Sequence, residues 1–166
     1  KSFIRSKSSG RKTFLISASE SFINLDKLHF AGNIPGINFA IFCQIFDIKT
    51  DLVHYPHPII SEIEIIDGIR MYSTKDIAAM KINAVLGRGV KKDFWDLYEI
   101  LHHYTLSEII GFYEQKYPKQ QLLISIPNAI TYFEDAEEQF MPEMLVAIDW
   151  DRIKSFIIDK VATLSL

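Results

Sequence analysis

Two cations with helical spacing are the residues of this sequence best suited to chemistry. In the stretch 76–98, Arg88 follows Lys81 by seven residues, so at about 100° per residue the two side chains lie within about 20° of each other on one helix face. Apolar residues such as Ile77 and Val85 border Lys81 on this face. A lysine desolvated in this way binds a phosphate more strongly than one in water. The alternative is that both cations only reach the surface past an apolar stripe.

Two carboxylates follow these cations. The turn GRG (87–89) is predicted to end the first helix, so a second helix starts near Lys91 and places Asp93 and Asp96 on one face near its positive end. We predict that Asp96 is a catalytic residue and that Asp93 contacts the substrate. The competing interpretation for Asp93 is that it complements the helix dipole and forms an ion pair with Arg88.

Asp76 is predicted to have a structural role. The sequence from Ser73 to Asp76 fits a capping box, in which the aspartate takes the place of the usual glutamate.

The order and spacing of these residues resemble the signature of the AbiEii-type nucleotidyltransferase toxins, which belong to the DNA polymerase β-like nucleotidyltransferase superfamily. The matching segments are D-I-A-A-M-K (76–81), Ala84, Arg88, K-D-F-W-D-L-Y (92–98), D-I-K-T-D-L-V-H-Y-P (47–56), Y-F-E-D-A-E (132–137) and Asp149-Trp150. The resemblance implies a split α+β catalytic core followed by a helical region. It also implies a toxin of a toxin-antitoxin or abortive-infection system, which transfers a nucleotide from a nucleoside triphosphate to an acceptor such as RNA and has an antitoxin protein as a partner.

The resemblance implies a role for Asp51 as a catalytic residue and a ligand of Mg²⁺. Residues 46–52 alternate between apolar and charged side chains, as a half-buried strand does. Asp51 occupies the place of a third family carboxylate, which would hold Mg²⁺ between nucleotide phosphates and the attacking hydroxyl. The alternative is the solvated outer face of a hairpin. On the helices, the resemblance implies that Lys81 neutralises the triphosphate, Arg88 supports it, and Asp96 orients Lys81 or a substrate hydroxyl.

The sequence departs from the family pattern in residues 1–46, which contain neither a G-[ST] helix start nor a D-x-D pair. These would supply the principal metal ligands, so this polypeptide is not expected to assemble a complete two-metal site. Because the sequence starts at Lys1 without a methionine, we expect either a piece of a longer protein or a degenerate member of the family. The alternative function is a non-catalytic module that binds protein or RNA.

Glycine and proline residues interrupt short β-rich segments before Ser73, and helical periodicity follows it. The sequence therefore divides into a β-rich part (1–72) and a helical part (73–166), which predicts an α+β protein. Strands are predicted at 37–43, 46–55, 62–66 and 69–72, with a possible helix near 20–28. Helices are predicted at 74–87, 91–103, 106–116, 119–133 and 150–163, and Pro127 is expected to kink or divide the fourth.

Composition favours a cytoplasmic protein. The 166 residues are 48% hydrophobic, but no run approaches the roughly 18 apolar residues of a membrane span, and the start lacks the apolar segment of a signal peptide. Cys43 is the one cysteine, so no internal disulfide is possible. Residues 1–30 carry six Lys and Arg against two acids, so they hold +4 and the remainder −7 of the net charge of −3. The basic end fits a contact with RNA or, alternatively, a mobile terminus.

Overall fold

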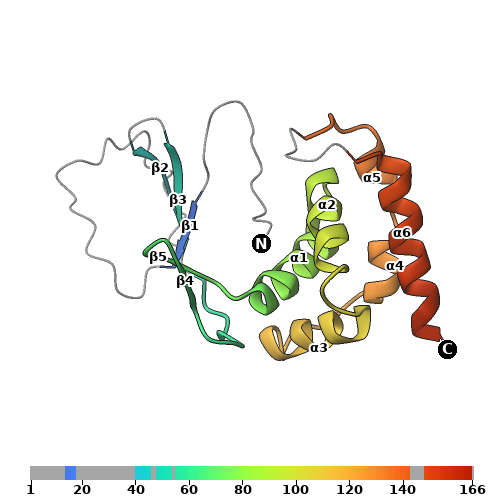
Figure 1. The fold of residues 1–166 in the computed structure, drawn as a ribbon, viewed down its shortest axis with the longest axis horizontal. Coiled ribbons are helices and arrows are strands. Elements are labelled where there is room, and N and C mark those ends of the chain that lie inside the picture. Colours follow the sequence, from blue (N-terminus) through green and yellow to red (C-terminus); the bar gives the residue numbers. More distant parts are fainter. Residues whose placement is uncertain (1–13, 18–39, 46–47, 54, 143–147, 166) are drawn as a thin grey trace. The chain divides into compact units, whose positions relative to one another are not determined.

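The computed structural model describes residues 14–17, 40–45, 48–53, 55–142 and 148–165 (Figure 1). These residues form two compact units. One contains a three-stranded sheet and extends to Pro56, and the other, from His57, contains a two-stranded hairpin and the helices. The predicted α+β class with a helical C-terminal region is confirmed. The predicted division into domains 1–72 and 73–166 stays a prediction.

The three-stranded sheet has the order β1-β3-β2, with β3 in the centre. Its strands are β1 (Phe14–Ser17), β2 (Ala40–Ile45) and β3 (Ile48–Val53). Strands β2 and β3 are antiparallel, whereas β1 runs parallel to β3 and places Leu15 opposite Asp51. Strands β2 and β3 correspond to the predicted strands 37–43 and 46–55.

Strand β1 was not predicted, because four residues in a basic stretch give little periodicity and its partner β3 is distant in sequence. The predicted helix near 20–28 lies outside the described residues.

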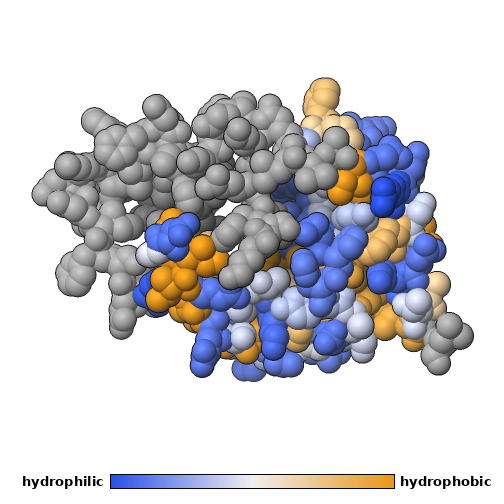
Figure 2. All heavy atoms as spheres, in the orientation of Figure 1, coloured by the Kyte–Doolittle hydropathy of each residue, from blue (hydrophilic) through white to orange (hydrophobic). Residues whose placement is uncertain are grey.

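The two-stranded hairpin consists of β4 (Glu64–Ile66) and β5 (Ile69–Met71). Its two-residue turn has φ of 52° at Asp67 and 75° at Gly68, and such left-handed pairs match the twist of the strands that they connect. Ile65 is 71% exposed and Ile69 is 48% exposed. Figure 2 shows the apolar surface that gathers at this hairpin. Both strands lie within the predicted segments.

Four of the five predicted helices are present, with bounds within a few residues of the prediction. They are α1 (Thr74–Arg88), α2 (Lys91–Ile100), α3 (Leu106–Lys116) and α6 (Trp150–Ala162). Helix α3 begins with a complete capping box, in which Thr105 and Glu108 bond reciprocally. No described helix is long and apolar enough to cross a membrane.

The prediction of one helix at 119–133 was wrong. Only α4 (Ile126–Ile130) is helical there, and the short α5 (Glu134–Glu137), which was not predicted, follows it. Ser125 caps α4, and Pro127 lies in the first turn. A proline fits that position because the first N–H groups of a helix have no partner inside the helix. Pro127 therefore marks the start of a helix and not a kink within one.

The helical unit has α1 at its centre. Helix α1 packs against α2, α3 and α4, and α6 packs against α2 (Figure 1). The apolar side chains that are fully buried between these helices are Ala78, Ala79, Ile82, Phe94, Leu97, Ile100, Ile109, Ile130, Ile153 and Ile157. This core fixes the faces that α1 and α2 turn away from it.

A buried ion pair joins α1 to α3. Asp76 and Lys116 are both 0% exposed, and Nζ of Lys116 lies 2.6 Å from Oδ1 of Asp76. The same ammonium donates to the backbone carbonyl of Pro58 at 2.9 Å. Lys116 was not singled out from the sequence, because nothing local connects it to a residue 40 positions earlier.

The carboxylate of Asp76 has three further donors. The Ser73 hydroxyl donates to it at 2.7 Å, and the N–H groups of Ile60 and Ser61 donate at 3.1 and 3.2 Å. Ser73 also accepts from the Asp76 N–H, so the predicted cap is present. Asp76 therefore does more than cap α1, because it also holds the strand-free segment before β4.

We predict that Lys116→Met lowers the free energy of unfolding by about 3–5 kcal/mol, because it leaves the Asp76 charge buried without its cation. Urea unfolding of the two proteins measures the difference. The matched control is Lys119→Met, since Lys119 is exposed and lies three residues further along, in the turn after α3. The double variant with Asp76→Asn should lose less than the sum of the single changes, and strictly additive losses would contradict this account.

Acid should remove the contribution of Asp76. Burial alone raises the pKa of this carboxyl, but Lys116, Ser73 and the Ile60 N–H outweigh it and hold the pKa below its ordinary value of 3.8. A depressed pKa in the folded state stabilises the fold above pH 3.8 and ceases to do so as the pH falls through the lower folded value. The wild-type protein should therefore lose more stability below about pH 4 than Asp76→Asn, as thermal melts across this range would measure. Parallel losses in the two proteins would exclude Asp76 as a cause.

Candidate functional site

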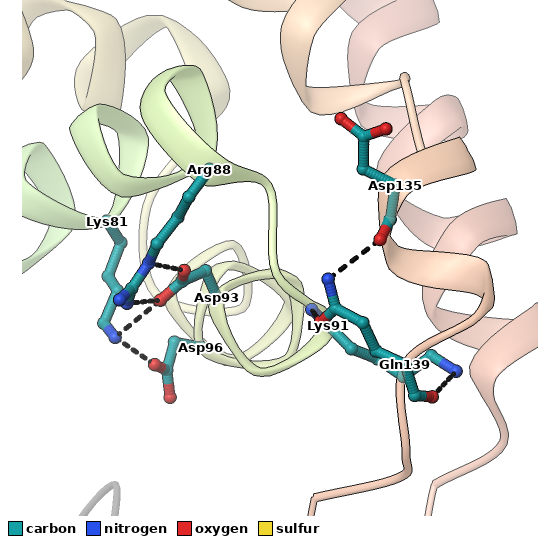
Figure 3. Close-up of polar contacts among 7 residues, drawn as sticks. All are labelled: Lys81, Arg88, Lys91, Asp93, Asp96, Asp135 and Gln139. Carbon is teal, nitrogen blue, oxygen red and sulfur yellow. Dashed lines mark hydrogen bonds and ion pairs between the residues drawn. The ribbon is translucent and has the colours of Figure 1, made fainter.

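A buried carboxylate holds two cations together where α1 meets α2. Asp93, in the first turn of α2, is 0% exposed. Nε of Arg88 lies 2.9 Å from its Oδ2, Nη2 of Arg88 lies 3.1 Å from Oδ1, and Nζ of Lys81 lies 3.2 Å from Oδ1. Figure 3 shows the three side chains converging. The guanidinium and the carboxylate form the two-pronged contact that fixes orientation as well as distance.

Asp96 completes the cluster one turn later. Its carboxylate pairs with the ammonium of Lys81. The side chains of Asp96 and Lys81 are 15% and 24% exposed, whereas that of Arg88 is 54% exposed. We call Lys81, Arg88, Asp93 and Asp96 the ion network. The structure thus brings together the four helical residues singled out from the sequence, and their action on a substrate stays a prediction.

The reversal of the chain between α1 and α2 explains why the side chains of the ion network lie close together. Gly89 adopts φ of 49°, a left-handed conformation that a residue with a side chain avoids, and its N–H bonds back to the carbonyl of Ala84. Helix α2 starts two residues later at Lys91. The last turn of α1, with Arg88, therefore lies beside the first turn of α2, with Asp93. The ion pair between these two residues, which belongs to the competing interpretation of Asp93, is present.

Burial and charge act in opposite directions on the protonation of Lys81. Burial alone lowers its pKa, but Asp96 and Asp93 outweigh burial and raise the pKa above the ordinary value. The lysine is therefore an ammonium at neutral pH. Burial raises the pKa of Asp96, and Asp93 adds to this, while Lys81 opposes both.

The ion network is formally neutral, with two cations and two carboxylates. An anion that binds here must therefore compete with Asp96 for Lys81, or use the part of Arg88 that Asp93 leaves open. Asp93 occupies Nε and Nη2 of Arg88 and leaves Nη1. This half-exposed guanidinium edge is the most accessible donor of the network.

Asp51 lies in the other compact unit, at the middle of the central strand β3, and is partly buried. Its predicted roles as a catalytic residue and a metal ligand stay predictions. No group of three or more His, Cys, Asp or Glu side chains among the described residues is arranged to hold a metal ion. One carboxylate suits a Mg²⁺ ion that is held mainly by phosphates, but it does not make a two-metal site.

A second set of contacts lies on the other side of the start of α2 and was missed from the sequence (Figure 3). The buried ammonium of Lys91 donates to the carbonyls of Glu137 and Gln139, at 3.3 and 2.9 Å. The N–H of Lys91 donates to Oε1 of Gln139 at 2.9 Å. The sequence could have indicated these contacts, because a lysine at the start of a helix opposes the helix dipole. Such a lysine is expected to have acceptors elsewhere in the structure.

Trp150 strengthens the same attachment. It stacks on Trp95 with ring centroids 5.1 Å apart and an interplanar angle of 7°. Its Nε1 donates to the carboxylate of Glu137 at 3.0 Å, and Nζ of Lys91 lies 5.3 Å from the centre of its ring. These contacts fix α5 and the segment after it to α2 and α6.

Comparison with known proteins identifies the family. Residues 26–163 match the family described as "Nucleotidyl transferase AbiEii toxin, Type IV TA system". An uncharacterized protein of Aquifex aeolicus is 33% identical over 118 residues, which are 69% of this chain and 56% of the relative. The chain thus spans about half the length of this curated relative. No solved structure matches this chain.

The family match covers most of the sequence, including the ion network and β3. This chain therefore belongs to the family of AbiEii nucleotidyl transferase toxins of type IV toxin-antitoxin systems.

Proposed function

We propose that this protein transfers a nucleotidyl group from a nucleoside triphosphate to an acceptor such as RNA, and that the ion network binds the triphosphate. The observation that carries the proposal is the attachment of Lys81 and Arg88 to one buried carboxylate, Asp93. Such an anchor presents two cations at a fixed separation. Fixed cations stabilise developing charge without first having to reorganise.

In the proposed reaction, an acceptor hydroxyl attacks the α-phosphorus and releases its proton to water, and the bond from that phosphorus to the bridging oxygen of the β-phosphate breaks. Pyrophosphate leaves with the electron pair. Lys81, which the raised pKa keeps protonated, neutralises the leaving group as it forms, and Arg88 supports it through its open edge. Asp96 orients the ammonium or a substrate hydroxyl, and Asp51 assists the metal or the attacking hydroxyl.

Asp93 acts as a positioning residue in this proposal. Its carboxylate is 0% exposed and already bonds to both cations, so it affects the substrate through them and not by contact. This differs from the direct contact with substrate that the sequence suggested for Asp93.

Mg²⁺ is proposed to arrive with the triphosphate and to supply charge neutralisation there, with Asp51 as its protein ligand. An antitoxin protein is the proposed partner, because the family is one of toxin-antitoxin systems. The cytoplasm is the proposed site of action, since nucleoside triphosphates and RNA occur together there.

A second candidate function is a module that binds protein or RNA without catalysis. It is favoured by the sequence of residues 1–46, which has no D-x-D pair. The lack of a three-ligand carboxylate group among the described residues also favours it. Nucleotide binding at the ion network separates the two functions.

We predict that Lys81→Met weakens binding of a nucleoside triphosphate in the presence of Mg²⁺ by at least about tenfold, because the variant keeps the apolar stem and loses the charge. Isothermal titration calorimetry measures the affinity. Lys119→Met, at an exposed lysine outside the network, should bind like the wild type. Unchanged affinity of Lys81→Met would contradict the proposed site, and a much lower melting temperature without any wild-type binding would make Lys81 a structural residue.

Substitution of Asp96 should affect nucleotide transfer, whereas substitution of Asp93 should affect the stability of the fold. In a longer form of the protein that carries the upstream D-x-D carboxylates, Asp96→Asn should strongly reduce transfer of a labelled nucleotide to RNA with little change in stability, because Asp96 is partly exposed and pairs with Lys81. Asp93→Asn should lower the free energy of unfolding by about 3 kcal/mol, because it leaves two cations without their buried partner.

Labelled-nucleotide incorporation and urea unfolding measure these two effects on the same preparations. Near wild-type transfer by Asp96→Asn would reduce Asp96 to a helix-start anion. An unchanged free energy of unfolding for Asp93→Asn would remove Asp93 as the anchor.

A further inference from the structure

A small pocket lies at the start of α2, next to the ion network. It has a volume of about 270 Å³ and is lined by Arg88, Val90, Lys91, Lys92, Gln139, Phe140 and Pro142. Three of these residues are cations and none is an acid. Pockets that enclose a small molecule usually have about 300–1,000 Å³. This one is below that range, so it suits one unit of a chain that passes over the surface better than a whole nucleoside triphosphate.

The residues that line this pocket carry positive charge, and the acids of α2 nearest to them, Asp93 and Asp96, are not part of the lining. Lys91 and Lys92 are the first two residues of α2, where the helix dipole is already positive, and Val90 supplies no side-chain cap. Lys92 is exposed, and its charge acts on Asp96 one turn later, whose ion-pair partner is Lys81. The ammonium of Lys91 donates to the carbonyls of Glu137 and Gln139, and its charge also acts on the Glu137 carboxylate. A sequence that places two lysines at this end loses helix stability, and a bound anion would restore it.

Phe140 adds an aromatic surface to the pocket. Its side chain is 98% exposed, and Met141 beside it is 53% exposed. The contacts of Lys91 with Gln139 hold the preceding residue in place, so the phenyl ring is presented from an anchored segment. In Figure 2, apolar side chains stand out from the surface at the top of the view, where Figure 1 places the segment after α5.

We propose that this pocket binds the acceptor RNA as a single strand, with a backbone phosphate on Lys92 and Arg88 and a base stacked on Phe140. Cations that follow a phosphate backbone and an exposed aromatic ring that stacks a base are the combination by which proteins bind single strands. The proposal rests on the proposed function, because it assigns a site to its acceptor.

Arg88 connects the two sites. Asp93 fixes Nε and Nη2 of its guanidinium in the ion network, and the same side chain lines the pocket. An RNA strand bound to Lys92 and Phe140 would therefore lie beside the proposed triphosphate site.

Fluorescence anisotropy with labelled single-stranded RNA tests the proposal on the whole chain. Phe140→Ala should weaken binding about tenfold through loss of stacking, and Phe140→Tyr should retain most of the affinity. Lys92→Ala should weaken binding and reduce the slope of log affinity against log salt by about 0.7, as expected for one lost phosphate contact with a single strand. Leu123→Ala, at another fully exposed apolar side chain, and Lys119→Ala are the matched controls.

The same variants, titrated with a nucleoside triphosphate and Mg²⁺ by calorimetry, separate the two sites. Unchanged nucleotide affinity together with weakened RNA binding supports the proposal. RNA affinity within twofold of wild type for Phe140→Ala and Lys92→Ala overturns it, as does a loss confined to nucleotide binding or a wild-type chain that binds no RNA. If the variants lose RNA binding and the wild type binds no nucleotide, the RNA site stands and the proposed transferase function fails.

Discussion

The fully buried ion pair between Asp76 and Lys116 is the interaction on which the helical unit depends. Neither side chain contacts water, so each charge requires the other, and breaking such a pair leaves an uncompensated charge in a medium of low polarity. The carboxylate also accepts from the backbone of Ile60 and Ser61. One aspartate thus joins the segment before β4, the start of α1 and the end of α3, and fixes the helix from which Lys81 and Arg88 extend.

The ion network repeats this arrangement at the other end of α1, with a difference that matters for function. Asp93 is as deeply buried as Asp76, but its two partners are only partly covered. Both cations are held in place and remain accessible to an anion from solvent. The buried pair near the start of α1 is closed to solvent, whereas the network near its end leaves Lys81 and Arg88 partly exposed.

Helix α2 links the two proposed sites. One side of its first turn supplies Asp93 to the ion network, and the other side binds the segment after α5 through Lys91. Its first turn therefore carries Lys91 and Lys92 beside Asp93, although lysine opposes the helix dipole there. The stacking of Trp95 on Trp150 holds this end of α2 against α6, so the charges belong to a packed framework and not to a loop.

The sequence by itself determined the features that depend on neighbouring residues. The glycine after Arg88, the cap at Ser73 and the helical spacing of Lys81 and Arg88 were enough to place α1, α2 and the meeting of their ends. The pattern of residues 76–98 also indicated the family. Pro127 was misjudged because a proline fits the first turn of a helix as well as it disrupts the middle, and only the position of the cap distinguishes the two.

Only the tertiary structure decided which partners the buried charges have. Lys116 meets Asp76 across 40 residues, and Lys91 meets Gln139 across 48. Such partners are selected by the packing of whole helices, which removes water from both groups at once, and no local pattern encodes that event. The same applies to Asp93, for which the sequence left open both a substrate contact and an ion pair with Arg88. Its burial, which depends on how α1 and α2 pack, makes it the anchor of the ion network.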